Sequence, residues 1–385
     1  MNDRSKDERH PLIGRREIVS GALAGLGAGA LVSCSKPESA PKSVESSTKV
    51  IKWKAQSHDP ALASDYEPFV KFCASVGELS EGQLVIEPHG PGEVVSIREM
   101  FAAVKTGKLD LAVTFPGYAD FIAGTSFLTS YPLGLDRPDQ WETWYYDLGG
   151  LGLARRMFEP HGVLFLAPVQ HDLNLIHSRI PIRSFEDFRG VKLRMPGGLI
   201  ADVFQAAGAK TVFLTGDQVY PTLQSGAIDA ADFAGPATNF SMGFANVAKY
   251  IILGPPSTPC IHQPVDLHCA LVGLERWNSL PKHLQAVLEY AVRRFSWDDY
   301  AHVQKENISA WERFRQKGVE IIRLSNSDID KLRRVAIPMW FKWAQKDSLA
   351  REAFESQLAY MKNPSVAYIT DEMLVDATGK ALSTL

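Results

Sequence analysis

The stretch from residue 189 to residue 236 constrains the fold of this chain most strongly, because short apolar runs alternate in it with helix-like segments. The runs that have the length and composition of strands are residues 190–197, 211–214 and 228–233. Strands that alternate with helices in this way predict an α/β fold with mostly parallel sheets. Ligands bind such sheets beyond the carboxyl ends of the strands, where this stretch places Arg194 and Asp232.

Two interpretations are open for Arg194 and Asp232. A guanidinium is always charged and its planar fork matches a carboxylate, so Arg194 is a candidate for gripping an anionic ligand. The glycines Gly197 and Gly198 that follow it allow a close backbone approach. Because a buried charge needs a partner, the alternative is a structural ion pair between Arg194 and Asp232. Otherwise Asp232 helps to define the pocket, directly or through a hard cation.

A short internal similarity extends this picture to a second part of the chain. Residues 104–112 and 223–231 each contain a helix end, a Gly cap, an apolar–Asp pair and the start of a short strand. This pattern predicts two lobes that each direct a helix–Gly–strand unit at a common cleft. Phe115, Tyr118 and Phe233 follow these strands and are expected to line a small apolar pocket, with core packing as the alternative.

The N-terminus has the pattern of an export signal. Arg15 and Arg16 precede an uncharged run that is too short for a membrane span, which needs about 20 apolar residues. The run ends in a lipobox-like sequence at Cys34, so residues 1–33 are expected to be a Tat-like lipoprotein signal and Cys34 the lipidated residue. An uncleaved anchor helix is the alternative. Residues 34–49 are polar and Pro-containing, which is typical of a flexible tether.

Composition excludes several classes of function. A chain of 385 residues, with 45% hydrophobic and 22% charged residues, is an ordinary globular protein long enough for two domains. The net charge of −3 and the lack of a basic stripe argue against a nucleic-acid partner. No hydrolase, zinc-protease or P-loop motif occurs, and the ten histidines show no metal-ligand spacing. Catalytic groups can still be dispersed in the sequence, so a secreted enzyme remains an alternative.

The rest of the chain adds helices, and a few polar candidates. Trp141, Trp144 and Tyr145 share one helix face, which is expected to pack in the core. Apolar residues at helical spacing predict a long helix over 284–316, and further helices are expected over 329–347 and 349–360. Pro338 lies within the helix expected over 329–347 and predicts that this helix is kinked or split. Cys260 and Cys269 either form a disulfide or stay as buried thiols.

Three motifs carry a resemblance to a known family. They are residues 190–197 (GVKLRMPG), residues 220–230 (YPTLQSGAIDA), and residues 247–250 (VAKY) followed by 262–264 (HQP). With them the chain resembles the DctP-type solute receptors of TRAP transporters, in the branch that binds 2-oxo acids and related monocarboxylates. The resemblance covers most of the chain after the tether.

The fold that this resemblance implies is a two-lobed, periplasmic-binding-protein-like α/β fold with a long helix spanning both lobes. The first lobe is expected to comprise residues 50–143 and about 233–275. The second lobe is expected to comprise residues 144–232 and about 276–325, and residues 326–385 form C-terminal helices.

The resemblance also implies roles for single residues. Arg194 binds the ligand carboxylate, and Asp232 stands where the branch usually has glutamate. In the family that residue helps to hold a sodium or calcium ion that bridges to the ligand, here together with the Phe233 carbonyl and Gln263. A further polar contact is expected from Gln170 or Asn174, between which the sequence does not choose.

The function that follows is a non-enzymatic, lipid-anchored periplasmic receptor. It captures a small carboxylate and delivers it to the membrane permease subunits of a TRAP transporter. The alternatives are a secreted α/β enzyme acting on a carboxylic acid and a ligand-binding protein for a sensor system. The sequence leaves a monomer and a homodimer both open.

Overall fold

The structure is a computed structural model that describes residues 50–366, 369–376 and 378–382. The expected signal peptide, the lipidated Cys34 and the tether lie outside the described residues. Within the described part, no helix is long and apolar enough to cross a membrane.

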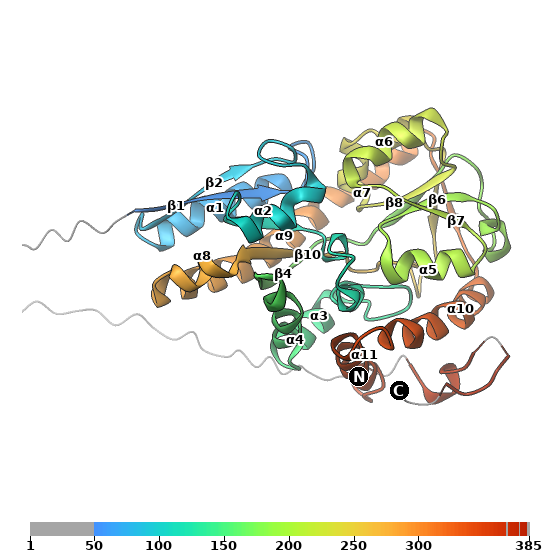
Figure 1. The fold of residues 1–385 in the computed structure, drawn as a ribbon. Coiled ribbons are helices and arrows are strands. Elements are labelled where there is room, and N and C mark those ends of the chain that lie inside the picture. Colours follow the sequence, from blue (N-terminus) through green and yellow to red (C-terminus); the bar gives the residue numbers. More distant parts are fainter. Residues whose placement is uncertain (1–49, 367–368, 377, 383–385) are drawn as a thin grey trace, which may run out of the picture. The chain divides into compact units, whose positions relative to one another are not determined.

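The first sheet is built mainly from the N-terminal third of the chain (Figure 1). Its strands, in spatial order, are β2 (Leu84–His89), β1 (Ile51–Ser57), β3 (Leu111–Thr114), β10 (Leu267–Gly273) and β4 (Val163–Gln170). The β1–β2 and β1–β3 pairs are parallel, whereas β10 runs antiparallel to both β3 and β4. A strand from late in the chain therefore lies between two early ones.

The second sheet has six strands (Figure 1). In spatial order they are β11 (Glu320–Arg323), β9 (Tyr250–Leu253), β5 (Leu175–Ser178), β8 (Ala230–Phe233), β6 (Lys192–Met195) and β7 (Lys210–Phe213). The pairs β6–β7, β6–β8 and β9–β11 are parallel, and β5 runs antiparallel to β8 and β9. Both sheets are thus mixed, which corrects the expectation of mostly parallel sheets.

Two strands, β4 and β9, do not lie in the sheet that the expected lobe boundaries assign to them. β4 was expected in the second lobe but pairs with β10 in the first sheet, and β9 was expected in the first lobe but pairs with β5 and β11 in the second. The chain crosses between the sheets directly after each of these strands. Composition does not mark such crossings, because the partner of a strand is set by contacts remote in sequence.

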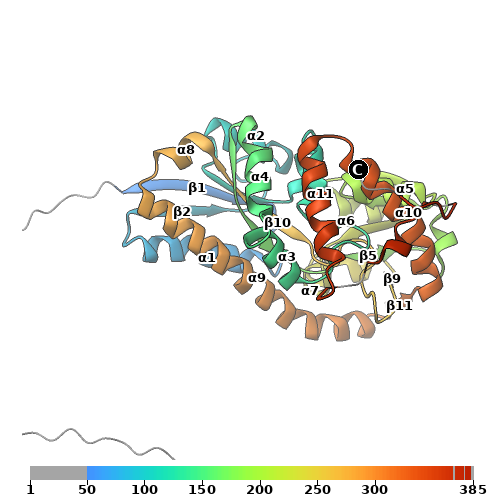
Figure 2. The same cartoon turned by 90° about the horizontal axis from the view of Figure 1, so that it is seen from below.

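The helices surround and connect the sheets (Figures 1 and 2). They are α1 (Tyr66–Leu79), α2 (Met100–Thr106), α3 (Pro138–Tyr146), α4 (Gly150–Phe158), α5 (Gly198–Ala206), α6 (Gly216–Ser225), α7 (Pro236–Ser241), α8 (Leu274–Ser279), α9 (Lys282–Gln316), α10 (Asn326–Ala344) and α11 (Ser348–Met361). The short 3-10 helices are η1 (Ile97–Glu99), η2 (Pro116–Tyr118), η3 (Ala123–Phe127), η4 (Glu159–His161), η5 (Phe185–Phe188), η6 (Phe244–Asn246) and η7 (Asp371–Met373).

The long helix α9 contacts both sheets (Figure 2). Near its start, Leu288 and Phe295 pack with Phe72 of α1 in the cluster that covers the first sheet. Near its end, Phe314 packs with Leu175 and other residues of the second sheet. The 35-residue helix therefore confirms the prediction for residues 284–316.

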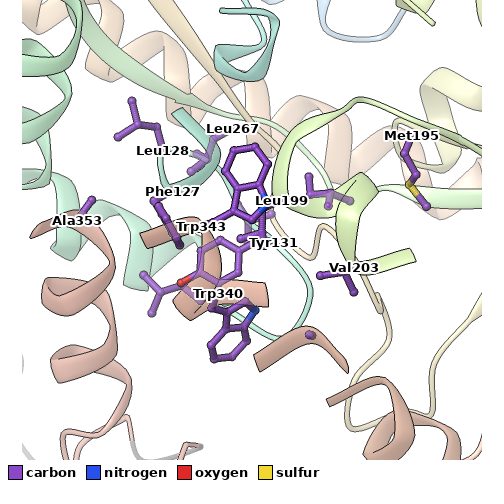
Figure 3. Close-up of a cluster of buried hydrophobic side chains, with 14 of the residues drawn as sticks. Phe127, Leu128, Tyr131, Met195, Leu199, Val203, Leu267, Trp340, Trp343 and Ala353 are labelled. Atoms are coloured by element: carbon purple, nitrogen blue, oxygen red, sulfur yellow. The ribbon is translucent and has the colours of Figure 1, made fainter. Parts of the chain in front are cut away.

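The largest core cluster joins elements from both sheets to the C-terminal helices (Figure 3). Leu267 of β10 and Met195 of β6 both belong to it, together with Trp340 of α10. Trp340 donates a hydrogen bond to the Pro132 carbonyl at 3.1 Å. Pro338 lies inside α10, which continues on both sides of it, so the helix is not split.

The aromatic face that the sequence assigned to the core is buried as expected. Trp141, Trp144 and Tyr145 of α3 are at most 1% exposed. The indole of Trp141 donates to the Leu135 carbonyl at 3.1 Å, and the rings of Trp144 and Tyr145 meet edge-on. The interpretation of this face as core packing is confirmed.

Candidate functional site

A pocket of about 280 Å³ is lined by residues from both sheets. Residues just beyond the ends of β1 and β3 form one wall, and the ends of β6 and β8 form the other. Most of the ligand-binding residues predicted from the sequence line this pocket. Those that line the pocket are Arg194, Asn174, Phe115, Tyr118, Asp232, Phe233 and Gln263.

Arg194 is held in the wall by four hydrogen bonds. It is 3% exposed and projects from β6 beside β8. Its Nη1 donates to the Asp232 carboxylate and to the Asp232 main-chain carbonyl, both at 2.8 Å. Its Nε and Nη2 donate to the Leu214 carbonyl at 3.0 and 2.9 Å. A guanidinium has five N–H groups, so this arrangement leaves one Nη2 N–H for a further acceptor.

The ion pair between Arg194 and Asp232 extends to a histidine. The second oxygen of Asp232 lies 2.7 Å from Nε2 of His262, and both residues are almost fully buried. Burial alone would lower the pKa of His262, but Cys260 and Asp232 beside the ring raise it to about 10. The raised pKa favours a protonated His262, and the two oxygens of Asp232 are shared between Arg194 and His262.

The residues that the resemblance assigns to a sodium or calcium ion lie together, with their polar groups already engaged. Both oxygens of Asp232 accept from the cationic partners described above. The amide of Gln263 accepts from Asn174 at 3.1 Å and donates to Asp266 at 3.3 Å. A cation at Asp232 and Gln263 would share the carboxylate with Arg194 and His262.

The structure separates the two alternatives for the further polar contact. Asn174 lines the pocket, whereas Gln170 does not. The Gln170 side chain donates to the Pro138 carbonyl at 3.0 Å, away from the pocket lining. Of the two alternatives, the structure favours Asn174, because the position of Gln170 at the end of β4 directs its side chain toward α3.

Three aromatic rings surround the polar groups. Tyr118 contacts Phe115 and Phe213, with ring centroids 5.4 and 6.2 Å apart, and burial raises its pKa. Phe233 stacks on Phe244 at 4.9 Å and lies 6.0 Å from the Arg194 guanidinium carbon. These rings give the pocket apolar sides around a small charged region.

The repeated helix–Gly–strand units lie in different sheets and have the same local structure. Gly107 and Gly226 both end a helix in the left-handed conformation, with φ of 75° and 78°. Asp110 before β3 accepts from the Lys54 backbone N–H at 2.8 Å, and Asp229 before β8 accepts from the corresponding N–H in the second sheet at 2.9 Å. Each unit ends at a pocket wall.

The first-sheet wall also carries a group of histidines and aspartates that are not among the candidates predicted from the sequence. These pocket residues are His58, Asp59, His171, Asp266 and His268. The sequence signal for this wall is the alternation of apolar and lysine residues over 51–55, which predicts a strand shortly before His58 and Asp59. Residues 171, 266 and 268 carry no such signal, because strand pairing alone brings them to residues 58 and 59.

Two groups of this wall have shifted pKa values. Burial would lower the pKa of His171, but Asp65 at 2.9 Å raises it well above its usual value. Burial raises the pKa of Asp266 to about 6, opposed by the charge of His171. Of the two alternatives for Cys260 and Cys269, the structure has buried free thiols, and Cys73, the other cysteine of the described residues, is also free and buried.

The protein has two sheets that share the long helix α9, with a pocket between the ends of their strands. This arrangement is that of a bilobal ligand-binding protein of the periplasmic-binding class. The profile of the family described as "Bacterial extracellular solute-binding protein, family 7" (DctP) matches residues 56–347. The chain belongs to this family.

Relatives and solved structures agree with this assignment. The chain is 25% identical over 352 residues to a monocarboxylate 2-oxoacid-binding periplasmic protein of Nostoc sp., covering 90% of this chain and 94% of the relative. The fold is similar to a TRAP solute-binding protein of Pseudoalteromonas atlantica with bound sodium and pyruvate, with a TM-score of 0.73, 22% identity, and 83% and 98% coverage. It is also similar to one of Bordetella bronchiseptica with calcium and picolinate, with a TM-score of 0.76, 21% identity, and 82% and 93% coverage.

Proposed function

We propose that this protein captures a small monocarboxylate, of the 2-oxo-acid class or close to it, for delivery to a TRAP permease. The observation that carries the proposal is Arg194, a buried guanidinium in the pocket wall with one Nη2 N–H left for an acceptor. A carboxylate oxygen is the acceptor that best matches a guanidinium. The solute-binding family and its 2-oxoacid-binding relative support the same assignment.

The size and lining of the pocket favour a compact ligand. Its volume is about 280 Å³, and Phe115, Tyr118 and Phe233 occupy its sides. Asn174 and Gln263 line the same pocket, and each amide keeps a second N–H that we expect to bond to another oxygen of the ligand. An ion of sodium or calcium at Asp232, Gln263 and the Phe233 carbonyl is part of the proposal, as the neighbours that bind pyruvate contain such ions.

The cellular setting is proposed from the family and the N-terminal sequence. A family of extracellular solute-binding proteins places the receptor in the periplasm. Cys34, at the end of the signal-like segment, is the proposed site of the lipid that anchors it to the membrane. The receptor performs no chemistry on the ligand and binds it by closure of its lobes, a hinge motion.

The test is the affinity for carboxylates of an Arg194→Lys variant. Lysine keeps the positive charge but loses the planar fork, so Asp232 is not left as an unpaired buried charge, as it would be in Arg194→Ala. A thermal-shift screen of small mono- and dicarboxylates first identifies ligands, because a ligand of the native state raises the melting temperature. Calorimetry then measures their affinity for the variant.

We expect the affinity of Arg194→Lys to fall at least tenfold. The exposed Arg189 precedes the same strand, and Arg189→Lys serves as the matched control with unchanged affinity. Equal affinity in wild type and Arg194→Lys would overturn the role of Arg194. Turnover of any bound acid, rather than release of it intact, would favour an enzyme instead.

A further inference from the structure

The first-sheet wall of the pocket carries a group of potential metal ligands that the proposed function does not use. His58 and Asp59 come from the loop after β1, and His268 comes from β10. One ligand atom of each residue lies within 4.8 Å of those of the other two. We propose that His58, Asp59 and His268 form a binding site for a divalent transition-metal ion such as Zn²⁺.

His58 is oriented as a metal ligand would need to be. Its Nδ1 lies 3.3 Å from the Val113 carbonyl oxygen, and a carbonyl can only accept, so this nitrogen carries the proton. The lone pair of the neutral ring is then on Nε2, which lies 3.6 Å from the Asp59 carboxylate. Histidines that bind metals commonly donate their other N–H to a carbonyl in this way, which sets the tautomer and the ring orientation.

Asp59 is positioned between the two imidazoles. Its Oδ2 accepts a hydrogen bond from the Ser57 hydroxyl at 2.9 Å, and the Asp59 N–H donates back to that hydroxyl at 3.1 Å. The same Oδ2 lies 3.6 Å from Nδ1 of His268. The carboxylate is therefore held facing both rings by a partner that does not neutralise it.

His268 is a buried polar group whose nitrogens lack close partners. Its side chain is 4% exposed, and its ring nitrogens lie 3.6 and 3.8 Å from the carboxylates of Asp59 and Asp266, beyond hydrogen-bond distance. Its ring also packs against the rings of His58 and His171, whose centroids are 4.4 and 4.5 Å away. His268 also lines the pocket, so a metal ion there can reach its ring and supply a close partner.

The neighbouring pair of His171 and Asp266 is better suited to a supporting role. Nε2 of His171 lies 2.9 Å from the Asp65 carboxylate, and the side chains of His171 and Asp65 are each 1% exposed. His171 stacks on His268 with an interplanar angle of 17°, which holds the His268 ring in place. The proposed ligands are therefore His58, Asp59 and His268, which line the pocket and hold no strong internal ion pair.

The kind of donor selects the kind of metal. Two imidazoles with one carboxylate suit zinc and related transition ions, whereas sodium, calcium and magnesium prefer oxygen donors alone. Ligand atoms around a tetrahedral zinc lie roughly 3.3 Å apart, so the side chains need only small rotations to close on an ion. Three protein ligands leave a coordination position open, and this position faces the pocket.

The site is separate from the expected cation site at Asp232. His58, Asp59 and His268 belong to the first sheet, whereas Asp232 belongs to β8 of the second and is already paired with Arg194. Metal binding at this site does not depend on a bound carboxylic-acid ligand. It can be tested whether or not the proposed function holds.

The experiment is a titration of tag-free, metal-stripped protein with Zn²⁺ by calorimetry, in the absence of carboxylates. We expect one equivalent of Zn²⁺ to bind, and Co²⁺ at the same site to give visible absorption bands. His268→Gln and His58→Gln should each weaken Zn²⁺ binding at least tenfold. His283→Gln is the matched control, because this histidine lies on α9 outside the pocket lining, where it is 3.0 Å from the Gln83 side chain.

The His58 and Arg194 variants separate metal binding at this site from misfolding and from carboxylate binding. His58 is partly exposed, so its variant remains informative even if His268→Gln fails to fold. Arg194→Lys should bind Zn²⁺ as tightly as wild type while losing carboxylate affinity, which separates this site from the proposed function. The metal site is overturned if wild type binds no Zn²⁺, or if His58→Gln and His268→Gln bind it as tightly as wild type.

Discussion

At the scale of single residues, the tertiary partners decide the meaning of a charge. Arg194 and Asp232 were both identified as site candidates, and both interpretations of Arg194 contribute to the structure. It forms the structural ion pair with Asp232 at 2.8 Å, and it still lines the pocket with one N–H left over. His262 could not be recognised as the third member, because only the fold brings its ring to 2.7 Å from Asp232.

His177 gives a prediction about pH at the same scale. It lies on β5, fully buried against Phe244 and Phe314, and its Nε2 is 2.9 Å from the Asn239 amide nitrogen. Burial lowers its pKa to about 3. The unfolded chain therefore binds a proton below about pH 6.5 that the folded protein excludes.

The stability contributed by neutral His177 is complete above about pH 6.5 and is lost as the pH falls toward 3. We expect this residue alone to lower the free energy of unfolding by about 2 kcal/mol between pH 7 and pH 5. Urea unfolding at the two pH values should show a smaller loss in His177→Gln than in wild type. The control His283→Gln should keep the wild-type loss, and an equal loss in all three proteins would contradict the prediction.

At the scale of elements, hydrogen bonds from a connection between two strands link it to the helices beside the pocket. Asp172 lies in the crossing from β4 to β5, where it accepts from Gln304 at 2.9 Å and Asn307 at 2.6 Å, both on α9. Asn307 in turn accepts from the Ala237 N–H at the start of α7. Local sequence predicts the long helix, but not its link to this connection between the strands.

Gly235 provides a test of this link. A Cβ added there would lie 1.7 Å from an oxygen of Asp172, although the glycine has ordinary backbone angles. Asp172 is anchored to α9 and cannot easily give way. We expect Gly235→Ala to lower the free energy of unfolding by about 2–3 kcal/mol, as overpacking does.

The matched control for Gly235 is Gly152, which is exposed in α4 and has no heavy atom within 4 Å of an added Cβ. Gly152→Ala should raise the free energy of unfolding by up to about 1 kcal/mol, because alanine favours a helix. Chemical denaturation of both variants checks the pair. If Gly235→Ala is as stable as wild type, the contact with Asp172 does not constrain the connection.

At the scale of the whole described unit, the core does not divide at the boundary between the sheets. The largest cluster contains Phe165 from β4 and Leu193 from β6, and Trp340 and Phe354 from the C-terminal helices pack into it as well. Unfolding either sheet therefore exposes apolar surface that belongs to both. We expect residues 50–382 to unfold in one cooperative transition.

Thermal unfolding followed by tryptophan fluorescence and by far-UV circular dichroism tests this expectation. The two midpoints should coincide in wild type. Trp340→Ala should lower the free energy of unfolding by about 3–5 kcal/mol and move both midpoints together, because the indole is fully buried. Two separated transitions would show that the sheets unfold independently.

The sequence alone determined the class of fold, most of the elements and much of one pocket wall. Alternating apolar runs and helical spacing are local properties, so they identified the strand holding Arg194, the buried face of α3 and the long helix α9. The family motifs then indicated a solute-binding protein, which the family match confirms. The pocket position of Asp232, Phe233 and Gln263 was also foreseen.

Only the tertiary structure decided which strands share a sheet and which side chains meet. In the structure, β4 and β9 each belong to the sheet opposite to the one expected. The Gln170 side chain faces away from the pocket, and His58 and His268 contact each other in the first-sheet wall. The physical reason is that spacing along the chain sets the face on which a side chain lies, whereas its neighbours depend on pairings between segments far apart in sequence. No local pattern records those pairings.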